Sequence, residues 1–200
     1  MGHPMDRLPE TGAAIRSARW SLAQELAAAT AAAALTGLGA RVQLHLPFTP
    51  VPVTGQVFCV LLAGAVLGPR LGFVSQVEYL AAGMAGLPVF AFGGGPAAAL
   101  GPTGGYLVGF PVAAAVVGAL CGRQRRAPWW RTAAACLAGV PAIYLCGAAW
   151  YAVWLADKGA HAGVMESLAQ SVAPFAAVDA GKAAAVAIIA PALRHRLLPR

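Results

Sequence analysis

An acidic and a basic residue, Asp179 and Lys182, interrupt a long apolar run near the C-terminal end of the sequence. On a helix, residues three apart share one face, so their side chains are expected to lie together. If the run crosses a membrane, such charges are costly and face a cavity or the interior of a helix bundle, often along the path of a ligand. The alternative is a structural ion pair, with Lys182 extending toward the membrane surface.

Two other stretches could line a site for a polar ligand. The first is the Pro-rich stretch LPFTPVPVTGQ, which ends at Gln56 and whose prolines forbid a regular helix. The second is the Gly-rich loop over residues 92–106, where exposed amides and close backbone approach would suit a polar ligand, although a plain outer turn can also be Gly-rich. Its glycines are Gly93, Gly94, Gly95, Gly101, Gly104 and Gly105.

Motifs for catalysis or metal binding are missing from the sequence. It has no GxxxxGK[ST] loop, no paired aspartates for head-group transfer and no Ser/His constellation in the apolar runs. The four cysteines form no CxxC pair, and the four histidines are too dispersed to act as metal ligands. We therefore expect no enzyme, no metal site and no cofactor.

The composition indicates a chain that is embedded in a lipid bilayer. Hydrophobic residues make up 59% of the sequence and charged residues 10%, whereas soluble domains carry about 25% charged residues. A chain of 200 residues cannot hide so much apolar surface from water. The net charge of +7 comes from arginines between apolar runs, which does not predict a nucleic-acid partner.

The apolar runs predict an all-α integral membrane protein with a single domain over residues 16–200, after a disordered tail over residues 1–15. A spanning helix needs about 20 mostly apolar residues. The second run is the shortest, since Gly68 and Pro69 end it. The six expected spans cover residues 21–40, 54–68, 71–90, 104–121, 132–155 and 174–193.

The distribution of basic residues predicts that both termini face the cytoplasm. With six spans, Arg41 and Lys158 lie on one side, Lys182 lies within the sixth run, and the other eleven basic residues lie on the opposite side. Lys and Arg favour cytoplasmic loops. The Pro-rich stretch, the Gly-rich loop and Asp179 then meet at the outer face, where we expect a ligand pocket.

Two features of the spans leave alternatives open. Glu78 could serve a proton path, the floor of a site or a contact between helices, and we favour the contact. The first run is rich in alanine, and small residues at four-residue spacing allow close helix packing. That packing could serve a partner protein or the bundle itself.

The ordered motifs LPFTPVPVTGQVFCVLLAGAVLGPRLG, YLAAGMAGLPVFAFGGG and LGPTGGYLVGFP resemble the BioY family, the biotin-specific substrate-binding (S) subunits of energy-coupling-factor (ECF) transporters. The resemblance runs from Ala29 to Cys121, and Asp179 with Lys182 resembles the closing pattern of the family. Glu78 stands where an apolar residue is expected, and Gly55 where a bulkier one is usual.

The resemblance implies a six-helix subunit in the cytoplasmic membrane of a prokaryote that captures biotin from outside with high affinity. Its implied partners are a transmembrane coupling subunit, which docks on the first helix at Ala29 and Ala33, and ATPase subunits. Asp179 and Lys182 would bind the ureido group of biotin. Further ligands would come from Gln56, Tyr106 and the loop amides of Gly94, Gly95, Gly104 and Gly105, with Arg41 or these amides at the carboxylate.

Two alternatives remain at this point. An S subunit for thiamine or riboflavin would use aromatic stacking or a cation site, and this chain has few aromatic residues near the outer loops. A small membrane-embedded enzyme would need a catalytic constellation of the kind that the sequence lacks.

Overall fold

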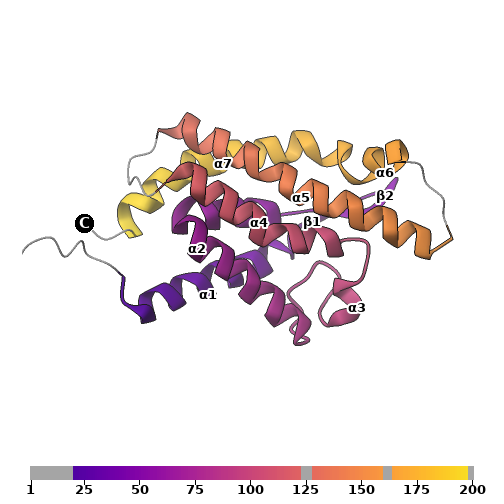
Figure 1. Cartoon of the computed structure of the whole chain (residues 1–200), viewed down its shortest axis with the longest axis horizontal. Coiled ribbons are helices and arrows are strands. Elements are labelled where there is room, and N and C mark those ends of the chain that lie inside the picture. The colour runs from indigo at the N-terminus through magenta and orange to yellow at the C-terminus, as the bar shows by residue number, and fades with distance from the viewer. Residues whose placement is uncertain (1–19, 123–127, 160–163, 198–200) are drawn as a thin grey trace, which may run out of the picture.

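The computed structural model describes residues 20–122, 128–159 and 164–197, so the expected tail over residues 1–15 lies outside the described part. Within it, the chain forms an elongated helical bundle with one small β-hairpin (Figure 1). In chain order the elements are α1 (Leu22–Gly39), β1 (Gln43–Leu46), β2 (Thr49–Thr54), α2 (Gln56–Met84), α3 (Pro96–Ala99), α4 (Gly104–Cys121), α5 (Trp129–Asp157), α6 (Val164–Ser171) and α7 (Ala173–Leu197).

Helix α2 consists of two antiparallel arms that meet at Gly68. Gly68 has φ 82°, a left-handed conformation that glycine adopts without strain, and Pro69 follows it. Gln56 donates a hydrogen bond to Tyr79, 23 residues further on, although a straight helix would separate them by about 34 Å. The arms therefore correspond to the second and third expected runs, joined where the Gly–Pro pair predicts a break.

The Pro-rich stretch forms the hairpin of β1 and β2, which pair antiparallel. The absence of a regular helix there agrees with the sequence prediction, whereas the strands add a small sheet to the expected all-α fold. The third expected run extends too far, since its helix ends at Met84. Gly86 has φ 99° and Pro88 follows shortly after, so the helix cannot continue.

The core lies between the arms of α2, α4, α5 and α7, while α1 packs against α2 at the edge of the bundle. Small residues bring the backbones close together: Gly64 lies against the backbone of Ala114, and Gly109 lies against α5 near Ile143. If either glycine were replaced by a residue with a Cβ, that atom would collide with the neighbouring backbone. Close packing of this kind stabilises membrane helices, which gain no hydrophobic energy from leaving lipid.

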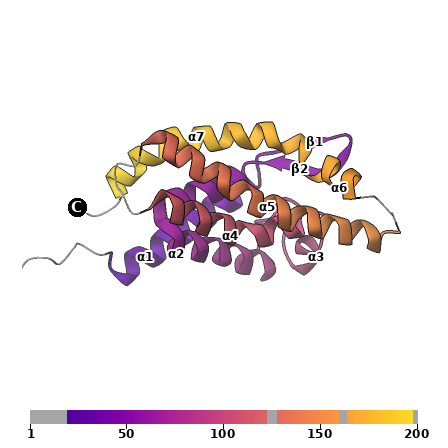
Figure 2. The same cartoon turned by 45° about the horizontal axis from the view of Figure 1, so that its top comes forward.

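The start of α1 and the end of α7 lie at one end of the bundle, and the hairpin, α3 and α6 lie at the other (Figures 1 and 2). Four stretches of the described chain are long and apolar enough to cross a membrane: Gln56–Met84, Gly104–Cys121, Trp129–Asp157 and Glu166–Leu197. The protein is therefore a multi-pass membrane protein. Two short helices, α3 and α6, were not expected from the sequence.

Candidate functional site

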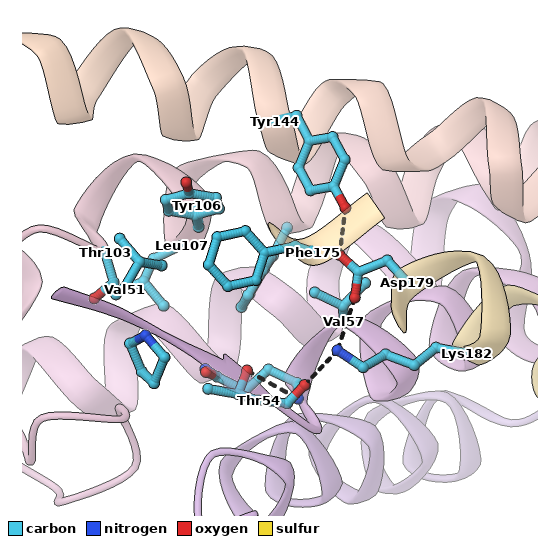
Figure 3. A pocket seen from close by; sticks show the side chains of 13 residues that line it. Val51, Thr54, Val57, Thr103, Tyr106, Leu107, Tyr144, Phe175, Asp179 and Lys182 are labelled. Carbon is cyan, nitrogen blue, oxygen red and sulfur yellow. Dashed lines mark hydrogen bonds and ion pairs between the residues drawn. The ribbon is translucent and has the colours of Figure 1, made fainter. Parts of the chain in front are cut away.

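A cavity lies at the end of the bundle that carries the hairpin, between β2 and helices α2, α4, α5 and α7 (Figure 3). Most of its wall is apolar, and its polar groups converge from different elements. It is lined by Val51, Pro52, Thr54, Gln56, Val57, Thr103, Tyr106, Leu107, Phe110, Tyr144, Phe175, Asp179 and Lys182. Apolar walls with a few convergent polar groups are typical of small-molecule sites.

Asp179 and Lys182 form an ion pair on one face of α7, as the spacing predicts. Lys182 Nζ lies 2.7 Å from Asp179 Oδ1 and also donates to the backbone carbonyl of Thr54, at 2.7 Å. Tyr144 of α5 donates to the other carboxylate oxygen, Oδ2, at 2.7 Å (Figure 3). Asp179 is 2% exposed, so its charge is held in a nearly dry environment by two donors.

The lysine also connects two elements that are far apart in the sequence. Thr54 is the last residue of β2, and its carbonyl lies within reach of α7 only because the hairpin folds back over the bundle. A charge-assisted hydrogen bond of this kind is about twice as strong as a neutral one. Lys182 therefore fixes the end of the hairpin to the ion pair in the cavity.

Gln56 lines the cavity as expected and is 3% exposed. Its amide nitrogen donates to the hydroxyl of Tyr79, which donates in turn to the backbone carbonyl of Val89 at 3.2 Å. The remaining acceptor capacity of Gln56 is its side-chain oxygen, Oε1. This oxygen, as an acceptor, and the second N–H of the amide, as a donor, are the groups of Gln56 that could serve a ligand.

Tyr106 also lines the cavity, and its ring packs against Gly147 of α5. Its hydroxyl donates to the backbone carbonyl of Ser171, the last residue of α6. The ring thus forms part of the apolar wall, and the hydroxyl holds the short helix α6 over this end of the bundle.

The four glycines proposed for the site do not line the cavity. Gly94 packs tightly against the carbonyl of Leu87, and Gly95, the N-cap of α3, has φ 86°. Gly104 and Gly105 begin α4, and a Cβ at either position would collide with Trp150 of α5. In this structure these glycines permit tight turns and close helix packing.

The other predicted residues also lie outside the cavity. Arg41 is exposed just before the hairpin. Ala29 and Ala33, proposed for docking, are 0% and 9% exposed, because they face the interior of the bundle. The outward face of α1 carries other small residues at four-residue spacing, namely Ala23, Ala27 and Ala31.

Sequence reasoning did not single out Tyr144 or the aromatic wall of the cavity. Tyr144 lies on the part of α5 that packs against α7 and hydrogen-bonds a residue 35 positions away. A polar aromatic residue in the middle of an apolar run was the available signal. Phe110 and Phe175 gave no signal, since phenylalanine is ordinary in such runs.

The cavity measures about 40 Å³, which is room for no more than a few water molecules. A bicyclic organic ligand would require its walls to move apart. Of these walls, the hairpin is joined to the ion pair, among the described residues, by the hydrogen bond from Lys182 to the carbonyl of Thr54. Opening at that contact would expose the carboxylate and the ammonium group together.

Comparisons of the sequence with known proteins identify the family of this chain. The model of the BioY family matches residues 11–199. The probable biotin transporter BioY of Pyrococcus horikoshii is 42% identical over 173 residues, which cover 86% of this chain and 97% of that protein. The biotin transporter BioY of Thermotoga maritima is 36% identical over 152 residues, covering 76% and 85%.

A solved structure has the same fold. The crystal structure of the S-component for biotin from an ECF-type ABC transporter matches with a TM-score of 0.76 and 25% sequence identity. The match covers 88% of this chain and 95% of that one.

Proposed function

This chain belongs to the BioY family, and on that premise we propose that it captures biotin for uptake as the substrate-binding subunit of an ECF transporter. Its partners are a transmembrane coupling subunit and ATPase subunits. One observation carries the assignment of the site: the ion pair of Asp179 and Lys182, whose side chains are 3% and 15% exposed, lies in a mostly apolar cavity. Biotin combines an apolar bicycle with a ureido group that both donates and accepts hydrogen bonds.

The ureido group suits the polar side of the cavity. Asp179 accepts from a ureido N–H through a lone pair that its two present donors leave unused, since a carboxylate offers about four acceptor sites. Lys182 donates to the ureido oxygen with its remaining N–H. The bicycle then lies against Phe110, Phe175 and Leu107, whose side chains come from two different helices.

The carboxylate tail of biotin extends toward the hairpin side of the cavity. Arg41, which precedes β1 and is exposed, is our candidate for a cationic partner there. The backbone amides of the Gly-rich loop are the alternative. The amides of Gly95 and Gly104 donate to the carbonyls of Gly83 and Gly101 in this structure, so a role of this loop in binding requires it to rearrange when the cavity opens.

The chain crosses the membrane six times in this proposal. The two arms of α2 count as two crossings because they run antiparallel, and α1, α4, α5 and α7 supply the others. The hairpin end then faces outward and both chain ends face the cytoplasm, as the basic residues predict. The cavity accordingly opens toward the outside, where biotin is captured.

Docking of the coupling subunit uses the first helix. Ala29 and Ala33 are packed inside the bundle, so the coupling subunit would contact the free face of α1. The exposed residues Ala27 and Ala31 lie on that face at four-residue spacing. Ala31→Leu should reduce association with the coupling subunit while biotin affinity is retained. Ala29→Leu should instead destabilise the subunit itself, because Ala29 is fully buried.

A binding assay on the purified chain tests the function. Isothermal calorimetry in detergent should give saturable binding of biotin, and no binding of thiamine or riboflavin at the same concentrations. Dethiobiotin, which keeps the ureido ring and loses the thioether ring, reports how much the apolar wall contributes. Binding of thiamine or riboflavin in preference to biotin would contradict the proposal.

A further inference from the structure

We propose that Glu78 binds a cationic side chain on a membrane helix of the coupling subunit, across the face formed by α1 and the second arm of α2. This α1–α2 face is defined by Ala27, Thr30, Ala31 and Ala34 of α1 with Val77 and Glu78 of α2. The inference rests on the proposed function for the identity of the partner. The geometry of Glu78 carries the rest.

Glu78 has a single weak partner within the described part of the chain. Its carboxylate oxygen Oε2 accepts a hydrogen bond from the hydroxyl of Thr30 at 3.0 Å, and Thr30 is itself exposed. No ion pair to Glu78 is formed by the described residues. Arg70, eight residues earlier on the same arm, pairs with Glu25 at 3.6 Å instead.

The position of Glu78 places this carboxylate deep in the membrane. It follows Pro69, the start of the second arm, by nine residues, which is about 14 Å along a helix axis. The proposed topology puts Pro69 at the cytoplasmic surface, and the hydrocarbon core is about 30 Å thick, so in this topology Glu78 lies near its middle. A charged side chain there is costly, and such residues nearly always face other protein or a water-filled cavity.

Small residues beside Glu78 allow another helix to approach closely. Ala27, Thr30, Ala31 and Ala34 lie on the outward face of α1 and are exposed. Helices that meet through small residues bring their backbones together and shorten the distance that a polar side chain must bridge. The α1–α2 face thus combines close approach with an unbalanced negative charge.

The charge favours a different protein over a second copy of this chain. A twofold symmetric dimer through this face would bring like parts of the face together and place two Glu78 carboxylates near each other in hydrocarbon, where like charges repel strongly. A partner helix with Lys, Arg or protonated His would neutralise the carboxylate and donate hydrogen bonds to it. The partner is therefore a membrane helix with a cation among small residues.

The test is assembly of the transporter with Glu78→Gln, which retains the acceptor for Thr30 and removes the charge. The chain is co-expressed with the coupling and ATPase subunits of its own organism and purified through a tag on this chain. Glu78→Gln should lower the recovered coupling subunit by about tenfold or more, with biotin affinity unchanged. Glu166→Gln, an exposed substitution on α6, is the matched control and should leave recovery unchanged.

A photo-reactive amino acid in place of Val77, which is 42% exposed, identifies the occupant of the face. It should cross-link to a coupling-subunit helix that carries a basic residue. Equal recovery of the Glu78→Gln and wild-type complexes, or cross-links only between copies of this chain, would overturn the inference. A wild-type chain that assembles but does not bind biotin would overturn the proposed function and leave this contact standing.

Discussion

Replacing Asp179 with alanine is expected to weaken biotin binding more than any other single charge removal in the chain. The carboxylate is 2% exposed and is held by Lys182 and Tyr144, each at 2.7 Å. A ureido N–H of biotin that binds there forms a charge-assisted hydrogen bond out of contact with water. Loss of such a bond costs about 1.5–3 kcal/mol, which corresponds to a dissociation constant about 10- to 150-fold larger.

Asp179→Asn removes the negative charge of Asp179 and keeps its shape, so it separates the effect of the charge from that of the shape. The asparagine oxygen can still accept from Lys182, and its amide can donate to the hydroxyl oxygen of Tyr144, which turns to accept. Binding by Asp179→Asn should therefore fall between that of the wild type and that of Asp179→Ala. Tyr144→Phe, which leaves the ion pair intact, should weaken binding only a few-fold, by loss of one hydrogen bond worth about 1 kcal/mol.

Isothermal calorimetry on detergent-purified variants measures these affinities, and thermal unfolding checks that each variant is folded. Asp157→Ala is the control, because Asp157 is exposed and, within the described part of the chain, its ion pair is with the neighbouring Lys158, at 3.5 Å. A folded Asp179→Ala variant with wild-type affinity for biotin would refute the reasoning. The ion pair would then be structural, and the ligand site would lie elsewhere.

Three further predictions concern the hairpin, the fold and the topology. Lys182→Met should weaken biotin binding and speed hydrogen exchange in β2, since it removes the bond to the Thr54 carbonyl; unchanged exchange would refute the attachment. Gly68→Ala should destabilise the subunit by about 1 kcal/mol or more in thermal unfolding, because Gly68 has φ 82°. Gly181→Ala, where a Cβ meets open space, should not destabilise it, so equal effects would contradict the strain argument. Arg196→Cys should be labelled by a membrane-impermeant thiol reagent only after the cells are opened, and labelling in intact cells would reverse the topology.

The sequence by itself determined the membrane class and the pairing of Asp179 with Lys182. These features depend on local order: composition decides whether water or lipid surrounds the chain, and a spacing of three places two side chains on one helical face. The break at Gly68 and Pro69 was local as well, and it became the turn between the two arms of α2.

The order of the motifs identified the family, but it did not show which role each residue has. The Gly-rich loop was expected to offer amides to a ligand, whereas Gly104 and Gly105 are packed against α5. A glycine that lets a ligand approach and one that lets a helix approach look alike in a sequence. The distinction depends on which neighbour occupies the space beside the missing Cβ.

Only the tertiary structure decided which residues surround the ion pair and which face of α1 is free. The contacts of Asp179 with Tyr144 and of Lys182 with Thr54 join residues 35 and 128 positions apart, and no local pattern encodes such distances. The alanine run of α1 has no single helical phase, so burial of Ala29 and exposure of Ala27 follow from how α1 packs on α2. These contacts depend on long-range packing. Alanines or tyrosines in similar apolar runs look alike in the sequence, and only the fold decides which residues lie against them.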